Sequence, residues 1–236
     1  MDHPHGAGHN LTETFFMGKI IELDTTDGQH LSAYLAEPGG PSKGGIVVVQ
    51  EIFGVNAHIR SVADRYAQAG YTAIAPAVFD SAEKGVELGY DQAGVQKGLD
   101  LVSKIGFDKA LASVQAAAKA VAGAGKVGVV GYCWGGSIAY LSAIRLNLPA
   151  VSYYGGRNVQ LVGEKATAPL LFHYGLKDAH ITEADREAVR AANPTAEFHV
   201  YDADHGFNCD ARGSFDAHSA KLAMERSLAF FARHLG

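Results

Sequence analysis

The sequence predicts an α/β fold, with a mostly parallel central sheet, an antiparallel N-terminal hairpin and helices on both faces. Strand-like and helix-like segments alternate from residue 45 onward, as in parallel sheets joined by right-handed crossovers. Residues 45–50 form a nearly continuous apolar run, which is typical of a strand buried on both faces. Residues 126–144 pass from a β-branched run through a glycine-rich turn into a helical pattern. We expect ligands to bind at the carboxyl edge of such a sheet.

The first half of the chain contains four predicted strands and two predicted helices, the second of them short. Residues 19–23 and 30–36 alternate around the turn signal Asp27-Gly28 and predict the hairpin. After the strand at 45–50, a helix with one apolar face ends near Gly70, and a further strand spans 71–75. Residues 78–107 mix charged and small residues, so we expect a short helix and a loop over the sheet edge.

The second half of the chain continues the alternation. Residues 108–121 predict an amphipathic helix that is closed by Gly123 and Gly125. Further strands are expected at 126–130, 150–155, 169–175 and 197–201, and further helices at 137–144, 184–192 and 214–235.

Size and composition indicate one domain over residues 17–236. The chain has 236 residues, of which 47% are apolar and 19% charged, enough to bury a large core. Residues 1–16 have no clear period and are interpreted as a tail or a cloning remnant, so His3, His5 and His9 are not expected to form a metal site.

Charge and hydropathy exclude several classes of partner. The formal net charge of −5 gives no electrostatic reason to expect nucleic acid or an anionic membrane as a partner. No apolar run approaches the roughly 20 residues of a membrane span, and no signal-peptide layout opens the chain. We expect a cytoplasmic protein, with a monomer slightly favoured, in which Cys133 and Cys209 do not form a disulfide.

The segment GYCWGG at residues 131–136 contains the candidate nucleophile, Cys133. Its pattern G-x-C-x-G is the nucleophile-elbow pattern G-x-S-x-G with sulfur in place of oxygen. The turn between strand and helix is so tight that Gly131 and Gly135 must lack a Cβ. It raises the Cys133 side chain above the sheet edge and leaves the Trp134 amide free, so that a nucleophile and an oxyanion donor lie side by side.

The partners of a nucleophilic cysteine are expected on later loops, in the order acid and then histidine. Asp178 follows the predicted strand that ends near residue 174, and His205 follows the one that ends near residue 201. Their order and placement after strands predict a catalytic triad of Cys133, Asp178 and His205. Asp204 is the alternative to Asp178.

Other residues of the same types have simpler interpretations. His173 and His199 lie inside predicted strands, where a hydrogen-bonded or half-exposed histidine is expected. His58 and His218 fall on helices and are expected to face solvent. Cys209 is interpreted as an ordinary buried or half-buried thiol.

The glycine cluster has two other interpretations, a nucleotide-binding loop and a purely structural turn. Its spacing is not the G-x-G-x-x-G of a dinucleotide loop, and it lacks the Lys-Ser/Thr of a phosphate-binding loop. A buried cysteine in a purely structural turn between strand and helix is the other alternative.

Three separated segments resemble one known family. QEIFGVN at 50–56, GYCWGG at 131–136, and Asp178 with HGF at 205–207 are similar to the dienelactone hydrolases, or carboxymethylenebutenolidases, of the α/β-hydrolase superfamily. The resemblance runs from about residue 19 to the C-terminus. It implies an α/β-hydrolase fold and a carboxylic ester hydrolase that attacks small lactones or esters. The family name suggests a role in the degradation of aromatic compounds.

The resemblance also implies roles for further residues. Glu51 would hold the resting Cys133 thiol, and the amides of Ile52 and Trp134 would form the oxyanion hole. The Cys133 thiolate, favoured by an adjacent imidazolium, would open an enol lactone to a thioester that water then hydrolyses. No metal ion and no organic cofactor is implied.

The sequence departs from the family at the substrate-binding arginines. The matching places, in residues 77–81 and at Cys209, hold no arginine, and Arg212 or Lys84 is a possible substitute. The expected substrate pocket is therefore more apolar, lined by Phe53, Phe79, Trp134, Tyr153 and Phe207, with Arg212 beside it. A different lactone or a simple ester is then the expected substrate.

Two functions follow from an activated cysteine on this fold. The first is a cysteine-dependent hydrolase of enol lactones or esters. The alternative is a non-hydrolytic thiol protein in which Cys133 senses or scavenges oxidants or electrophiles. The complete triad favours hydrolysis, because sensing needs neither an oriented base nor an oxyanion hole.

Overall fold

The computed structural model describes residues 18–236 and contains a central eight-stranded sheet. Its strands are β1 (Lys19–Asp24), β2 (His30–Ala36), β3 (Gly45–Val49), β4 (Thr72–Pro76), β5 (Val127–Tyr132), β6 (Ala150–Tyr153), β7 (Leu170–Gly175) and β8 (Glu197–Tyr201). The helices are α1 (Ala57–Gln68), α2 (Gln92–Ala120), α3 (Trp134–Arg145), α4 (Glu183–Ala192) and α5 (Ala217–Leu235), with three short 3₁₀ turns at Val78–Ser81, Ala122–Ala124 and Asn158–Leu161. The tail expected at residues 1–16 lies outside the described residues.

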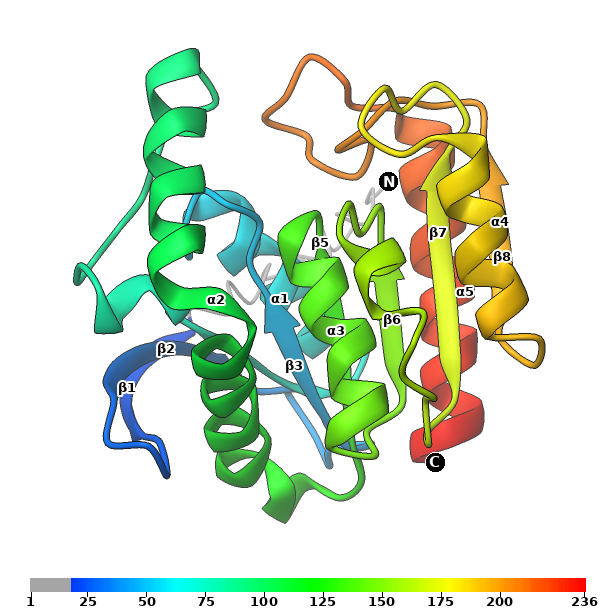
Figure 1. Ribbon diagram of the computed structural model, residues 1–236. Coiled ribbons are helices and arrows are strands. Elements are labelled where there is room, and N and C mark those ends of the chain that lie inside the picture. Colours follow the sequence, from blue (N-terminus) through cyan, green and yellow to red (C-terminus); the bar gives the residue numbers. More distant parts are fainter. Residues whose placement is uncertain (1–17) are drawn as a thin grey trace, which may run out of the picture.

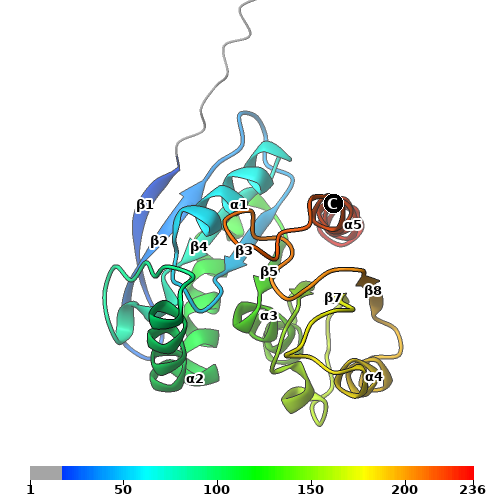
Figure 2. The ribbon, with the colours of Figure 1, turned by 90° about the horizontal axis from the view of Figure 1, so that it is seen from above.

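The strand order is β1-β2-β4-β3-β5-β6-β7-β8. β2 pairs antiparallel with both β1 and β4, whereas β4, β3, β5, β6, β7 and β8 run parallel to one another. Helices α1 and α5 lie on one face of the sheet, and α2, α3 and α4 lie on the other (Figures 1 and 2). The predicted α/β fold, with its mostly parallel sheet and N-terminal hairpin, is confirmed.

Local sequence features explain where several elements begin and end. All five residues of β3 are buried, as expected for a central parallel strand between two helical layers. Helix α1 begins after Asn56, whose side-chain oxygen accepts a hydrogen bond from the Ile59 amide at 3.1 Å. The chain leaves α1 through Gly70, whose φ of 102° suits glycine. The stop predicted near Gly70 is therefore observed.

Helix α2 differs from the sequence prediction. We expected a short helix and a loop over 78–107 and a helix that starts at 108, but α2 already begins at Gln92. Asp91 caps it by accepting a hydrogen bond from the Gly94 amide at 2.8 Å. Gly106, with a φ of 65°, breaks the helix where the predicted one was to start. The prediction failed because this glycine and the polar residues around it obscure a helix whose tertiary contacts support it.

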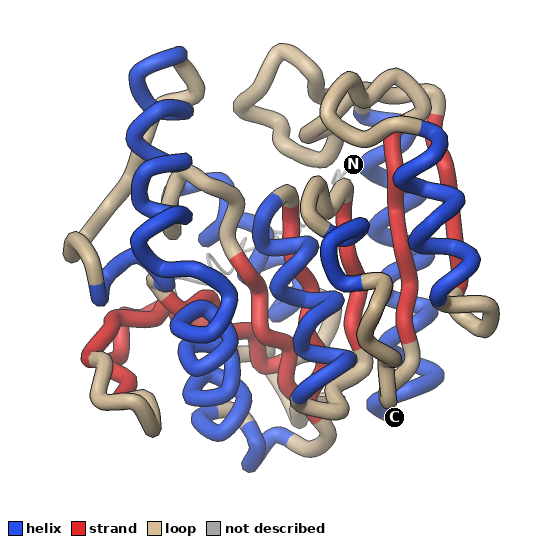
Figure 3. Tube along the Cα trace, in the orientation of Figure 1, coloured by secondary structure: helices blue, strands red, loops and turns tan. Residues whose placement is uncertain are grey.

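The carboxyl ends of the parallel strands meet at one edge of the sheet. The loops that leave these strands gather there, at the top of Figure 3, and the upper part of α2 rises beside them. Side chains that are far apart in sequence therefore come together at this edge. Within residues 18–236, none of the helices has the combined length and apolar character that a membrane span requires.

Candidate active site

Cys133 lies in the tight turn between β5 and α3. Its φ of 57° and ψ of −122° are strained for a residue with a side chain. A Cβ on Gly131 would lie 1.8 Å from the Gly135 carbonyl oxygen, and one on Gly135 would lie 2.3 Å from the Gln50 carbonyl oxygen. The chain can thus make this turn only with glycine at both positions, as the sequence pattern predicts.

His205 and Asp178 lie on the loops after β8 and β7 and meet at Cys133. The Nε2 atom of His205 is 3.3 Å from the Cys133 sulfur, and its Nδ1–H donates to Oδ2 of Asp178 at 2.6 Å. The Asp178 side chain is completely buried and that of His205 is 10% exposed. The three side chains form a continuous chain of thiol, imidazole and carboxylate.

The electrostatics of the site favour a protonated His205. Burial lowers the pKa of this imidazole, but the Cys133 charge and the hydrogen bond that the ring donates to Asp178 have the larger combined effect and raise it to about 10. A positively charged imidazole beside sulfur stabilises a thiolate.

Asp178 is fixed by more than His205. Its Oδ1 accepts a hydrogen bond from the His180 amide at 2.8 Å, so both carboxylate oxygens have partners. Asp204, the alternative acid, accepts a hydrogen bond from the backbone amide of His205 rather than from the ring. Asp178 is therefore the carboxylate that orients the imidazole.

The amides of Ile52 and Trp134 are free to receive an anion. Ile52 follows β3 in a turn, and Trp134 is the first residue of α3, where no intrahelical acceptor is available. Neither amide donates a hydrogen bond to any group within residues 18–236. Both residues line the same cavity as Cys133, which is the arrangement that an oxyanion hole requires.

A cavity of about 320 Å³ opens over Cys133 and His205. Its other lining residues are Ile52, Phe53, Val95, Leu99, Val102, Trp134, Gly156, Arg157, His180 and Arg212. A larger groove of about 700 Å³, which includes residues 165–170 and 192–197, contains none of the triad residues. The smaller cavity is the candidate substrate site.

The residues expected to line the pocket divide into two groups. Phe53, Trp134 and Arg212 line the cavity. Phe79, Tyr153 and Phe207 are buried and do not belong to its lining. Phe79 stacks on Trp134 at a ring distance of 5.7 Å, Phe207 packs on Tyr154 at 5.2 Å, and Tyr153 bonds to Ser227 at 2.8 Å. These three aromatic residues pack beneath the residues of the site and do not contact the cavity.

Sequence reasoning did not identify the wall that α2 provides. Val95, Leu99 and Val102 lie in the segment that we expected to be a short helix and a loop. Their spacing of three and four residues is a helical signal that was present in the sequence. Arg157 and His180, on the loops after β6 and β7, were also missed.

Glu51 contacts Arg212 rather than Cys133 in this conformation. Its Oε1 accepts a hydrogen bond from Nη1 of Arg212 at 3.2 Å, and its side chain is 1% exposed. The Cys133 sulfur bonds to His205 instead. The role of Glu51 as the partner of the resting thiol stays a prediction.

The structure also places the other histidines and the second thiol. His173 is fully buried and bonds to Tyr201 and Ser227, consistent with a hydrogen-bonded strand residue. His58 was expected to face solvent, and this prediction was wrong. The residue is only 4% exposed, and it lies among the buried residues of α1. The residue is polar but occupies the inward face of the helix. Cys209 is a buried free thiol.

The fold and the elbow at Cys133 are those of the α/β-hydrolases. The sequence pattern of the dienelactone hydrolase family matches residues 31–235. The chain is 32% identical over 224 residues to the carboxymethylenebutenolidase of Pseudomonas putida, an alignment that covers 90% of this chain and 95% of that protein. The chain belongs to the dienelactone hydrolase family.

Solved structures agree with this assignment. A provisionally assigned dienelactone hydrolase from Klebsiella pneumoniae is 37% identical, with a TM-score of 0.76 over 91% of this chain and 99% of that chain. A dienelactone hydrolase-like promiscuous phosphotriesterase from metagenomic libraries also has a TM-score of 0.76, over 93% and 100% of the two chains. At 21% identity, the second similarity shows the fold alone.

Proposed function

We propose that this protein is a cysteine-dependent hydrolase of enol lactones or related esters. The observation that supports it best is the short chain of contacts from the Cys133 sulfur through His205 to Asp178. Family membership supports hydrolysis in general, and the thiol, base and acid give that hydrolysis a mechanism.

In the first step the Cys133 thiolate attacks the acyl carbon of the ester. The new carbon–sulfur bond pushes the carbonyl electrons onto oxygen, and the amides of Ile52 and Trp134 donate hydrogen bonds to this oxyanion. Collapse of the intermediate breaks the bond to the leaving oxygen. The electron pair of that bond goes to the enolate oxygen, which takes up the proton that His205 held at Nε2. In a lactone this enol stays joined to the acyl group, which is now a thioester of Cys133.

In the second step water hydrolyses the thioester. Neutral His205 accepts a proton from the attacking water, while Asp178 stabilises the imidazolium that forms. The same two amides stabilise the second oxyanion. The carbon–sulfur bond then breaks, the carboxylic acid leaves, and the thiolate–imidazolium pair is restored.

The cavity favours a substrate with a substantial apolar part. Val95, Leu99 and Val102 form one wall, with Phe53 at another side. Arg212 already bonds to Glu51, whereas Arg157 forms no ion pair with any residue in the part of the chain that the structure describes. Arg157 is therefore the cation available to a substrate carboxylate.

A turnover assay tests the proposal. Wild type and Cys133→Ala are compared on p-nitrophenyl acetate, a neutral enol lactone and a carboxylated dienelactone. Cys209→Ala serves as the matched control, since it removes the other thiol. We expect turnover by wild type and Cys209→Ala, and loss of turnover in Cys133→Ala.

The same assay separates hydrolysis from the alternative function. A wild-type protein that turns over no ester or lactone, but whose Cys133 reacts rapidly with peroxide, would be a thiol sensor or scavenger. Turnover that persists in Cys133→Ala would instead show that another nucleophile acts.

A further inference from the structure

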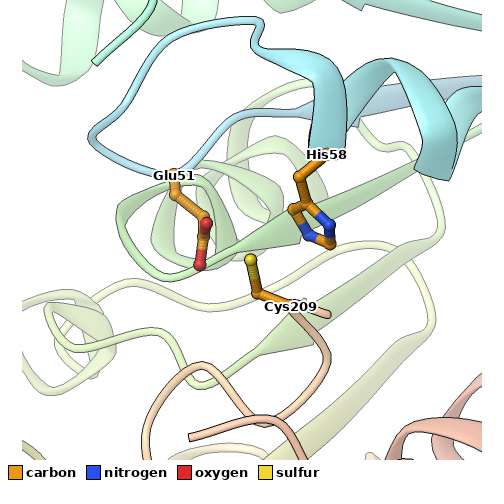
Figure 4. A group of neighbouring side chains, drawn as sticks. All are labelled: Glu51, His58 and Cys209. Atoms are coloured by element: carbon orange, nitrogen blue, oxygen red, sulfur yellow. The ribbon is translucent and has the colours of Figure 1, made fainter. Parts of the chain in front are cut away.

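A second group of buried side chains lies outside the chain from Cys133 to Asp178. Glu51 comes from the loop after β3, His58 from the first turn of α1, and Cys209 from the loop between β8 and α5. One potential ligand atom from each lies within 4.8 Å of the others. Figure 4 shows the Glu51 carboxylate and the His58 ring directed toward the Cys209 sulfur.

Two polar atoms of this cluster are buried without a partner. Oε2 of Glu51 and Nε2 of His58 make no hydrogen bond to any described residue. The exposed fractions of Glu51 and His58 are 1% and 4%. Removing such atoms from water is costly unless a partner is present, so both atoms are suited to bind a water molecule or an ion.

The other polar side-chain atom of Glu51 and of His58 has a hydrogen-bond partner. Oε1 of Glu51 bonds to Arg212. Nδ1 of His58 is 3.3 Å from Oδ1 of Asp210, whose other oxygen accepts a hydrogen bond from Arg65 at 3.1 Å. Glu51 and His58 therefore each have one polar atom that is held by a hydrogen bond and one, Oε2 or Nε2, that has no partner among the described residues.

The contact with Asp210 determines which tautomer His58 adopts. Because the Asp210 carboxylate accepts a hydrogen bond from Nδ1–H of His58, the lone pair of the neutral ring is on Nε2. A carboxylate that orients a histidine in this way is characteristic of metal sites.

We propose that Glu51, His58 and Cys209 bind a Zn²⁺ ion through Oε2, Nε2 and Sγ. Carboxylate, imidazole and thiolate are the ligand types that zinc takes, and three protein ligands leave a fourth position for water. Zinc bonds of about 2.0–2.3 Å require the ligand atoms to lie closer than 4.8 Å, so the side chains move inward on binding.

Zinc binding at this site requires the loss of one proton, from the Cys209 thiol. The Cys209 thiol, which donates to the Tyr90 oxygen at 3.4 Å, gives up that hydrogen bond and releases its proton to solvent as sulfur bonds to zinc. Burial raises the pKa of this thiol, and the adjacent Glu51 charge raises it further. The doubly charged ion offsets the two anionic ligands. The site links the loop that carries Ile52 to the loop that carries His205.

Zinc binding by the full chain tests this site independently of hydrolysis. All proteins carry His3→Ala, His5→Ala and His9→Ala, which removes the other histidine cluster of the sequence. After equilibrium dialysis against Zn²⁺, we expect about one ion per chain. Cys209→Ser should lose this ion, and the matched variant Cys133→Ser should keep it.

Cobalt gives a spectroscopic readout that identifies the sulfur ligand. With Co²⁺ in place of Zn²⁺, a thiolate-to-cobalt charge-transfer band should be present in Cys133→Ser and absent in Cys209→Ser. A band that disappears only in Cys133→Ser would place the ion at the triad and overturn the proposal. A folded parent protein that binds no zinc would also overturn it.

Two further variants cover the case in which Cys209→Ser fails to fold. His58→Gln should abolish stoichiometric binding, while Asp210→Ala should weaken zinc affinity by roughly 10- to 100-fold because the histidine loses its orienting partner. Unchanged affinity in both folded variants would contradict the assignment. Since the Cys133→Ser protein lacks the proposed nucleophile, these results do not depend on the proposed hydrolase activity.

Discussion

The sulfur of Cys133 lies 3.3 Å from Nε2 of His205, although the two residues are 72 positions apart in the chain. One side chain stands on the turn after β5 and the other on the loop after β8. Their contact depends on the parallel sheet, which brings the ends of both strands to one edge.

The protonation state of His205 predicts the pH dependence of the reaction. Despite burial, the Cys133 charge and Asp178 raise the pKa of His205 to about 10, so its protonated form persists to a higher pH than in an isolated histidine. We expect kcat/KM for an enol lactone to hold between about pH 7 and 9 and to fall as the pH rises toward 10. The measurement is a pH profile corrected for spontaneous hydrolysis. An alkaline decline centred near pH 6.5 would contradict this picture.

Removal of His205 should affect both proton transfer and thiolate formation. His205→Ala is therefore expected to lower kcat/KM by more than the roughly 10²- to 10⁴-fold typical of a general base. His199→Ala is the control, since His199 is half-buried on β8 and belongs to no part of the cavity lining. Steady-state kinetics on p-nitrophenyl acetate measures both. Near-normal turnover by His205→Ala would refute the role of this residue.

The elbow predicts a large difference between two glycine substitutions. In Gly131→Ala the new methyl group would overlap the Gly135 carbonyl oxygen, so we expect a loss of about 1–3 kcal/mol or more in the free energy of unfolding. Gly163→Ala meets no atom within 4 Å and should change it by less than about 0.5 kcal/mol. Urea unfolding followed by circular dichroism compares the two. Equal stabilities would show that the turn relaxes around the added methyl group.

Arg157 should matter only for a substrate that carries a carboxylate. Loss of one charge-assisted hydrogen bond, about 1.5–3 kcal/mol, predicts a roughly 10- to 100-fold fall in kcat/KM for the carboxylated dienelactone in Arg157→Gln. The neutral enol lactone should be affected less than about twofold. An equal loss on both substrates would mean that Arg157 supports the loop rather than the substrate.

Local patterns predicted the elements near the active edge of the sheet. The glycine spacing around Cys133 and the apolar run at β3 are short-range signals with one dominant structural outcome, and Asp178 and His205 each follow a predicted strand. The sheet then brings them together. The meeting of Cys133, Asp178 and His205 at one edge therefore followed from the order of the strands that precede them.

Two contacts across long sequence separations, both outside the Cys133–His205–Asp178 chain, escaped prediction. Arg212 pairs with Glu51 across 161 positions, and the buried His58 contacts Asp210 across 152 positions. No local pattern encodes either contact. The wall from α2 was missed for a different reason, since Gly106 interrupts a helix whose first half contains many polar residues.

Identification of the acylated residue tests the central claim most directly. Wild type is mixed with a slowly hydrolysed activated ester, quenched in acid during turnover, digested and analysed by mass spectrometry. We expect the acyl group on the peptide that contains Cys133, as a thioester that hydroxylamine removes, and its absence from Cys133→Ala. Turnover with the acyl group on another residue, or with no acylated Cys133 under conditions that trap the intermediate, would contradict a covalent role for this cysteine.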